Sequence, residues 1–446
     1  MNKKIIPVYA INLKSRTDRK KFILTQFFER EEFQFYLVEA HDHKIGAIGL
    51  WITIRNILKD LVDPNEEYII LCQDDHLFTM GYSKEHLLYC IDEVRSLRAD
   101  LLTCGVSGFT TAIQISQNIF WVEKFSGLQF AVIFRKFFQK ILDANFETVI
   151  AADLKLCELT ENKFFIYPFL SRQKEFGYSD VTAGNNAKGH IDNAFKNSSE
   201  NVTIINRVSN FYKQKLIMTV PLQNSESPES IVIPTYIIHL NEKRRCLSDI
   251  EKQFTGKEEF DIRSLKACHH KNKQLGLWLS IKKIIEIAIE NDDDVIIICR
   301  EDHQFTEHYE RSHFINLIWQ AGILGCNVLI GGMGSFNLAL PISDVLFWID
   351  SFWSSKFFII YRDFYIRILQ EPFSDSDTLE MKFSEMTSNK MGIFPYISNQ
   401  NDFGYSGDTD MNNVKGQITN LFDEGSRRLD AIQKAYLKYQ LHGKTR

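Results

Sequence analysis

Two short stretches of this chain combine an apolar strand with carboxylates and a histidine. Residues 69–79 read IILCQDDHLFT, and residues 296–306 read IIICREDHQFT. In an open α/β sheet, ligands bind beyond the carboxyl ends of the strands. Carboxylate oxygens together with one imidazole suit Mg²⁺ or Mn²⁺. The candidate metal ligands are therefore Asp74, Asp75, His76, Glu301, Asp302 and His303.

The two stretches are not equivalent. Gln73 precedes the acids of the first stretch, whereas Arg300 precedes those of the second. A guanidinium group carries only donors and cannot ligate a cation, so the first stretch is the better metal site. A plainer interpretation is that both sets of acids are solvated and simply end a strand. The acid, Asp, His, Phe and Thr that recur at matched places in the two stretches favour a site.

The whole domain around these stretches is repeated. At an offset of 227 residues, GLW at 49–51 matches GLW at 276–278, and FGYS at 176–179 matches FGYS at 403–406. This period far exceeds the about 20–50 residues of a solenoid repeat. The polar stretch LQNSESPES lacks an apolar period and is typical of a linker. We therefore expect a first domain at 1–221, a linker at 222–230, and a duplicate, more diverged domain at 231–446.

The elements that position these residues alternate between strands and helices. In each copy a β-rich run, at residues 5–13 or 230–240, comes before an amphipathic helix that begins at the shared GLW. That helix has apolar residues at three- and four-residue spacing. The strand that ends in the acids follows, and another helix comes after it. This alternation predicts an α/β fold for each domain, with a mainly parallel sheet flanked by helices.

The composition excludes several classes of protein. Of the 446 residues, 44% are hydrophobic and 24% are charged, as in ordinary globular proteins. A net charge of −5 without a sustained basic run argues against nucleic-acid binding. No apolar run approaches the about 18 residues of a membrane-spanning helix. Eight cysteines without a CxxC pair indicate a reducing compartment, so we expect a cytoplasmic protein with no membrane span.

Several motifs, in order along residues 6–180, resemble those of glycosyltransferase family 25, the lipopolysaccharide and procollagen galactosyltransferase group. The opening YAINLKSRTDRKKFI fits the family pattern I-N-L-x-x-R-x-D-R through Asn12, Arg16 and Arg19. The stretch IILCQDDHLF resembles the metal motif ILEDD, with Gln73 in place of the first acid. The run FAVIFRKFFQKIL resembles a strand and helix of the family, after which Asp153 falls near the family's PVD.

The resemblance extends to residue 180 of the first copy but is incomplete. YPFLSRQKEFGYSD resembles the ending P-x-x-x-Q-x-x-x-x-SDI through Gln173, Ser179 and Asp180. The Cys and Ser-His of the family's IGCxLSH helix are absent from IGAIGLWITI. The second copy departs further, since His239 and Cys246 stand where the first copy has Asn and Arg. The first domain is therefore expected to be the main catalytic domain.

The resemblance implies two tandem GT-A-like domains, the fold of nucleotide-diphospho-sugar transferases. It implies a metal-dependent, inverting glycosyltransferase that moves a galactose-like sugar from a nucleotide-sugar donor, commonly a UDP-sugar. The acceptor would be a glycan, a lipid-linked molecule or a peptide, as in lipopolysaccharide biosynthesis. Mn²⁺ or Mg²⁺ would neutralise the leaving diphosphate. Because the first acid is missing, the ion would be held by Asp74 with His76 or by Asp75 alone.

Roles for the remaining residues follow from the same resemblance. Inverting transfer needs a carboxylate that takes the proton of the acceptor hydroxyl. Asp153 is the favoured base, Glu380 is its counterpart, and Asp180 is a rival; alternatively, Asp153 only stabilises a helix start. The expected donor-binding residues, of which the arginines could instead be solvated, are Asn12, Arg16, Arg19, Gln173, Ser179 and Gln400. The missing first acid leaves open a rival function, a non-catalytic tandem pseudo-glycosyltransferase that binds a nucleotide or carbohydrate.

Overall fold

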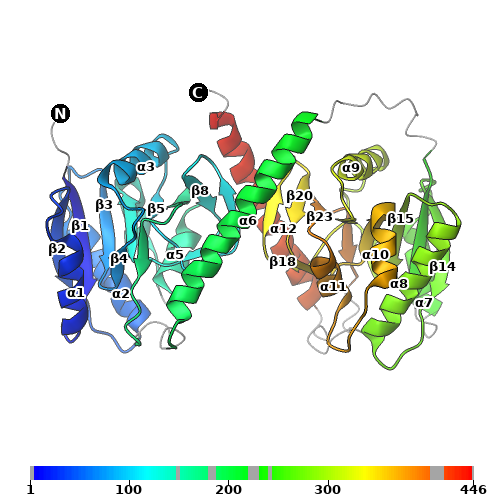
Figure 1. Cartoon of the computed structure of the whole chain (residues 1–446), viewed down its shortest axis with the longest axis horizontal. Helices are drawn as coiled ribbons and strands as arrows, with labels where there is room; N and C mark the ends of the chain where they lie inside the picture. Colours follow the sequence, from blue (N-terminus) through cyan, green and yellow to red (C-terminus); the bar gives the residue numbers. More distant parts are fainter. Residues whose placement is uncertain are drawn as a thin grey trace. The chain divides into compact units, whose positions relative to one another are not determined.

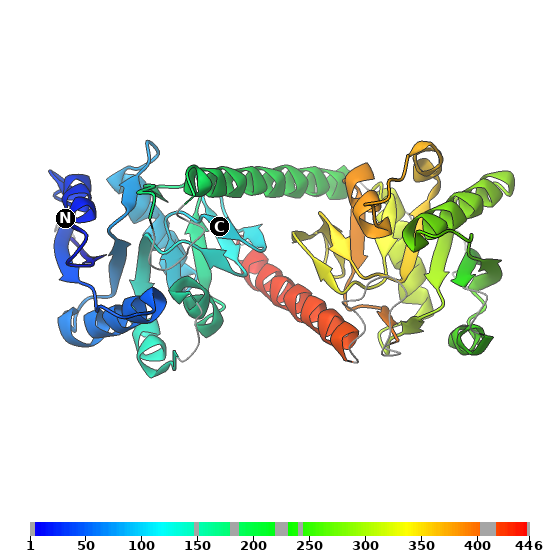
Figure 2. The same ribbon diagram turned by 90° about the horizontal axis from the view of Figure 1, so that it is seen from below.

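The computed structural model describes residues 5–146, 151–178, 187–218, 231–239, 244–401 and 416–443 (Figure 1). The chain forms two compact units: unit 1 comprises residues 1–207 and 437–446, and unit 2 comprises residues 208–436. Helix α6 (His190–Met218) therefore begins in unit 1 and ends in unit 2, and α12 (Gln417–Gly443) does the reverse. Both helices are long and unbroken (Figures 1 and 2). The expected linker at 222–230 lies outside the described residues.

Unit 1 is built on a mixed sheet of eight strands. The spatial order is β2 (Phe33–Glu39), β1 (Ile6–Asn12), β3 (Tyr68–Gln73), β10 (Phe130–Phe134), β5 (Leu101–Thr103), β11 (Lys163–Ile166), β8 (Ile119–Val122) and β7 (Ala112–Gln114). Strands β10 and β8 run opposite to the other strands of this sheet. Every residue of β1 is buried, and so is all of β3 except its last residue. Such continuous apolar strands are typical of a sheet that is covered on both faces.

Two short ribbons and a set of helices complete unit 1. One ribbon pairs β4 (His76–Phe78) with β12 (Ser171–Gln173), and the other pairs β6 (Gly108–Phe109) with β9 (Phe125–Ser126). The helices are α1 (Thr17–Phe27), α2 (Gly46–Asn56), η1 (Ile57–Leu61), α3 (Lys84–Ser96), α4 (Arg135–Asp143), α5 (Ala152–Leu159), the first part of α6 and the last part of α12. Helix α3 begins where Ser83 accepts a hydrogen bond from the His86 N–H, an ordinary N-cap.

Unit 2 repeats this architecture. Its sheet has the order β14 (Phe260–Lys266), β13 (Ile233–His239), β15 (Val295–Arg300), β22 (Phe357–Tyr361), β17 (Val328–Ile330), β23 (Lys390–Ile393), β20 (Leu346–Ile349) and β19 (Ala339–Pro341). Its ribbons pair β16 (His303–Phe305) with β24 (Ser398–Gln400), and β18 (Ser335–Phe336) with β21 (Phe352–Trp353). Its helices are the last part of α6, α7 (Arg244–Gln253), α8 (Lys273–Glu290), α9 (Arg311–Ile323), η4 (Arg362–Phe364), α10 (Tyr365–Gln370), α11 (Leu379–Met386) and the first part of α12.

The duplication is confirmed at the level of single residues. Each strand of unit 2 begins and ends 227 residues after its counterpart in unit 1, and the strand order is the same. The predicted fold class is confirmed: two tandem α/β domains, each with a mainly parallel sheet flanked by helices. Trp51 and Trp278, at matched places in α2 and α8, are both buried and serve as core anchors. Among the helices described, none combines the length and the apolar run needed to cross a bilayer.

Candidate functional site

A pocket of about 790 Å³ opens in unit 1 where β1 and β3 end. Its walls come from the start of α1, the loop after β2, the turn after β3, the loop before β10, the start of α5 and the start of α6. The pocket brings together residues that the sequence predicted as site residues, namely Arg16, Arg19, Asp74, Asp75, Asp153 and Gln173. It also contains residues 41–44 of the loop after β2, including two histidines.

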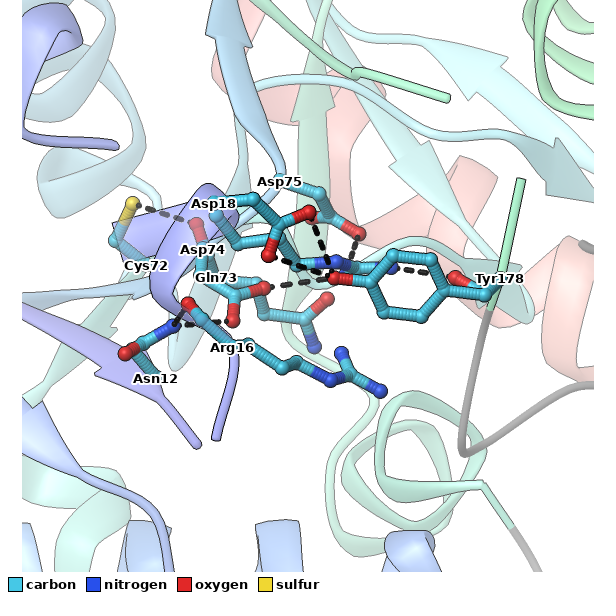
Figure 3. A network of polar contacts seen from close by, with 9 residues as sticks. Asn12, Arg16, Asp18, Cys72, Gln73, Asp74, Asp75 and Tyr178 are labelled. Atoms are coloured by element: carbon cyan, nitrogen blue, oxygen red, sulfur yellow. Dashed lines mark hydrogen bonds and ion pairs between the residues drawn. The ribbon is translucent and has the colours of Figure 1, made fainter. Parts of the chain in front are cut away.

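A network of polar side chains, several of which line the pocket, connects β1, α1 and the turn after β3 (Figure 3). The Nδ2 of Asn12, at the end of β1, donates to Asp74 Oδ2 at 2.8 Å. The Nη1 of Arg19 donates to Asp74 Oδ1 at 3.1 Å and lies 3.4 Å from Asp75 Oδ2. Asn12, Arg19, Asp74 and Asp75 are all buried. One guanidinium therefore compensates two adjacent buried carboxylates.

Aromatic side chains from the end of the described segment 151–178 cover the arginines. The Arg19 guanidinium carbon lies 4.6 Å from the Tyr178 ring centre and 4.8 Å from that of Phe176, within cation–π distance. Its Nη2 also donates to the Tyr178 carbonyl oxygen. The Tyr178 hydroxyl donates to Asp18, as Figure 3 shows, and Arg16 lies 5.1 Å from the same ring. These contacts hold Arg19 in place from a part of the chain distant in sequence.

The surroundings of Asp75 shift the pKa of its carboxyl group. Its burial and the adjacent Asp74 raise its pKa, the Arg19 guanidinium opposes them, and the result is a pKa of about 6. Its Oδ1 atom is buried without a hydrogen-bond partner. A perturbed, incompletely paired carboxylate in a pocket is a candidate functional group.

The fit of a divalent cation depends on which oxygens are free. Both carboxylate oxygens of Asp74 accept hydrogen bonds, so Asp75 Oδ1 is the open ligand of the pair. Within the described ranges, no group of three or more His, Cys, Asp and Glu side chains is arranged to hold a metal ion. Mg²⁺ is often bound by one or two carboxylates together with substrate phosphates and waters. The unpartnered Asp75 oxygen fits a site of that kind.

The expected pairing of Asp74 with His76 is not formed, because His76 belongs to the core. His76 is fully buried on β4, its Nδ1 lies 2.8 Å from the Ser171 hydroxyl, and its ring stacks on Phe130 at 4.4 Å. Burial holds the pKa of His76 well below its usual range. His303 repeats these contacts with Ser398 and Phe357. Strand β4 directs the imidazole into the aromatic cluster, so the histidine recurs in both copies for packing.

Asp153 lines the pocket and also lies in the first turn of α5. Its Oδ2 accepts from the Gly127 N–H at 2.8 Å, and its Oδ1 accepts from the Leu154 N–H at 2.9 Å. Burial raises the pKa of Asp153, and the two N–H donors oppose that shift. Gly127 has a φ of 113°, a conformation that side chains rarely adopt. The two interpretations of Asp153, helix-start residue and pocket carboxylate, are therefore compatible.

The remaining predicted residues of unit 1 divide into two groups. Gln173, on β12, lines the pocket. Its backbone is in register with His76 in the β4–β12 ribbon, so the ribbon that buries the histidine also presents the glutamine. Ser179 and Asp180, a donor-binding residue and the rival base, lie outside the described residues.

Unit 2 places a different cation beside its aspartate. The Nζ of Lys356 lies 3.6 Å from Asp302 Oδ2, and Gln400 Nε2 donates to the same oxygen at 2.9 Å. Lys356 is 4% exposed and occupies the position of Gln129 in unit 1. Asp302, the counterpart of Asp75, is thus paired with a lysine next to β22 rather than with an arginine from the first helix. Glu301 follows β15, and Glu380 is in the first turn of α11, as Asp153 is in α5.

Sequence reasoning missed Tyr178 and Lys356. Tyr178 is part of the FGYS motif that recurs in the second copy. The recurrence indicated that the motif matters, but the sequence alone assigned no role to its tyrosine. Lys356 could have been found as the replacement of a neutral Gln129 by a cation in the segment just before a buried strand. Neither residue is close in sequence to the acids it serves.

Comparisons with known proteins give little beyond the fold. No family model matches the chain, and no curated protein matches it. A solved structure of apo UDP-glucose pyrophosphorylase is similar with 12% identity and a TM-score of 0.27, over 47% of this chain and 82% of that chain. This similarity is distant.

Proposed function

We propose that the chain is a glycosyltransferase that uses a nucleotide-sugar, a UDP-sugar in the first instance, and that the donor binds in the unit 1 pocket. The observation that carries the proposal is the gathering of Arg16, Arg19, Asp75 and Asp153 in one pocket at the carboxyl ends of strands. Its volume of about 790 Å³ is within the range of small-ligand sites, about 300–1,000 Å³. The motif resemblance supplies the reaction class.

The two arginines have different roles in this proposal. Arg16 is half-buried on the pocket wall and can pair with a diphosphate, since a planar guanidinium matches phosphate oxygens bidentately. Arg19 is already engaged by Asp74, Asp75 and the Tyr178 carbonyl oxygen. It therefore positions the carboxylates and contributes positive potential to the pocket.

Asp153 is the proposed general base. Its carboxylate is held in one orientation by two backbone N–H donors, and each oxygen keeps a second lone pair for a proton. The raised pKa of Asp153 brings it closer to the operating pH, where a general base is most effective. It would accept the proton of the acceptor hydroxyl as that oxygen attacks the sugar.

Asp75 is the residue that would hold Mn²⁺ or Mg²⁺, through its unpartnered Oδ1. When bound, such an ion neutralises the charge that develops on the leaving diphosphate. In unit 2, Lys356 already neutralises the corresponding Asp302, and Arg300 replaces a metal-motif acid. Unit 1 is therefore proposed as the main transferase, with unit 2 binding metal weakly.

The test is release of free UDP from a panel of UDP-sugars, with and without Mn²⁺, by the full chain. We expect Mn²⁺-dependent release that Asp75→Ala abolishes and Asp302→Ala largely preserves. Loss of turnover only in Asp302→Ala would show that the domains are assigned the wrong way round. Calorimetric binding of UDP without turnover of any donor would contradict the transferase and favour the non-catalytic binding protein.

A further inference from the structure

One position beside the acids of the site differs in charge between the two copies. Gln129 directly precedes β10 in unit 1, and Lys356 directly precedes β22 in unit 2. The two places are equivalent in the structure. The backbone oxygen of each residue accepts a hydrogen bond at 3.0 Å from the last residue of the strand before the acids, Gln73 in unit 1 and Arg300 in unit 2. The side chain at this position therefore starts from the same point relative to the acids in both units.

The two side chains have different charges and partners. Gln129 is fully buried and neutral; its Nε2 donates to the Gly105 carbonyl oxygen at 2.9 Å, and its Oε1 has no hydrogen-bond partner. Lys356 is also buried, and its Nζ lies 3.6 Å from Asp302 Oδ2. This position therefore neutralises the nearby aspartate in unit 2, whereas the amide in unit 1 cannot do so.

Unit 1 keeps a negative charge that a metal ion can neutralise. Asp74 and Asp75 are both buried and share one cation, Arg19, whose Nη1 lies 3.1 Å from Asp74 Oδ1 and 3.4 Å from Asp75 Oδ2. Two carboxylates and one guanidinium leave one negative charge, and the amide of Gln129 does not change that balance. A divalent cation at the unpartnered Asp75 Oδ1 would therefore meet a net negative charge.

Unit 2 has an oxygen of the same kind but a different charge. The Oδ1 of Asp302 is also buried without a hydrogen-bond partner, so an open oxygen does not distinguish the two units. Arg300 and Lys356 bring two positive charges to the two carboxylates of Glu301 and Asp302, which leaves no net charge. A positive charge beside the carboxylate opposes a divalent cation even at the effective dielectric constant of a protein.

We infer that the residue before β10 or β22, Gln129 or Lys356, determines which unit binds a divalent cation together with its nucleotide ligand. The inference rests on the proposed function and names a specificity-determining residue of that site. Glutamine leaves Asp75 open to Mn²⁺ or Mg²⁺, whereas lysine supplies Asp302 with a permanent internal cation. Both side chains are buried and unbranched, so charge is the main difference between them.

The experiment changes this residue and measures Mn²⁺ binding from the EPR signal of the free ion. The full chain is titrated with Mn²⁺ alone and then with Mn²⁺ and UDP, with UDP without protein as the blank. We expect one Mn²⁺ site in the wild type. Gln129→Lys should lower its affinity at least about tenfold, because the new ammonium group repels the ion. Gln129→Met, a neutral change of similar size, should keep the affinity within about threefold.

The reverse exchange tests the same position in unit 2 and does not depend on the folding of Gln129→Lys. The background is a chain with Asp75→Asn, which removes the unit 1 site, and Arg300→Gln, which copies Gln73. Adding Lys356→Gln to this background should raise the Mn²⁺ affinity of unit 2 at least about tenfold.

Several results would overturn the inference. One is wild-type Mn²⁺ affinity in Gln129→Lys. Another is an equal loss in Gln129→Met, which would show that the hydrogen bond to Gly105 matters rather than the charge. No gain from Lys356→Gln, or no Mn²⁺ site in the wild type, would also overturn it. Mn²⁺-dependent UDP release is measured in parallel, because its absence alone would contradict the transferase and not the metal preference.

Discussion

Replacing Asp75 by asparagine should make unit 1 more stable at neutral and alkaline pH while removing a group that the proposed site needs. Asp75 is 8% exposed, and its burial and the adjacent Asp74 raise its pKa to about 6 against the pull of Arg19. An aspartate in an unfolded chain has a pKa of about 3.9. Between these two values the folded chain binds a proton that the unfolded chain does not, so the free energy of unfolding falls as pH rises.

The size of the effect follows from this difference in pKa. A shift of about two units corresponds to about 3 kcal/mol between the two protonation states. The cost of the charged carboxylate is absent below the unfolded pKa, grows between about pH 4 and pH 6, and is complete above the folded pKa. Asp75→Asn, which keeps the shape without the charge, should raise the free energy of unfolding by up to about 3 kcal/mol at pH 8 and hardly at all near pH 4.

The assay is urea unfolding at both pH values, followed by pulsed hydrogen exchange and mass spectrometry. Peptides that contain β3 report on unit 1 separately from peptides of unit 2. Wild type and variant are compared in parallel, so that titration of other groups cancels. The variant should also lose Mn²⁺-dependent UDP binding. A gain in stability together with a loss of function is common when a residue of a functional site is replaced.

Asp302→Asn is the matched control. Asp302 is 3.6 Å from the buried amine of Lys356, and removing one partner of a buried pair leaves the other charge uncompensated. This variant should lower the free energy of unfolding of unit 2 by about 3 kcal/mol at pH 8. Destabilisation of unit 1 by Asp75→Asn at pH 8, or an equal gain at pH 4 and pH 8, would refute the reasoning about Asp75.

Two further variants test individual roles. Asp153→Asn should reduce turnover by about 10²–10⁴-fold with UDP affinity unchanged by calorimetry, because general-base catalysis contributes about that factor; retention of turnover would leave Asp153 as a helix-start residue only. His76→Phe should lose the hydrogen bond to Ser171 and lower the free energy of unfolding by about 1–2 kcal/mol in urea titrations. Its Mn²⁺ affinity should stay that of the wild type, and a large drop would return His76 to the list of metal ligands.

The sequence by itself determined the fold class and the place of the unit 1 pocket. A gapless repeat with an offset of 227 residues requires two domains of the same strand order, and every strand in the described residues obeys it. The apolar strand before Gln73 has to be a central, buried strand, and the acids after it have to lie at its carboxyl end. These conclusions depend only on patterns along the chain, where local periodicity and chain direction decide the outcome.

Only the tertiary structure decided how the side chains are shared between packing and the site. The order Asp-Asp-His does not show that the turn keeps the acids at the pocket while strand β4 carries the imidazole into the core. The partners that set the charge of the acids are also distant: Arg19 is 55 residues from Asp74, and the Tyr178 carbonyl oxygen is 159 residues from Arg19. In unit 2 the corresponding carboxylate, that of Asp302, is paired with Lys356, which directly precedes β22. Local sequence cannot specify such contacts, because they exist only once the sheet has brought separate segments together.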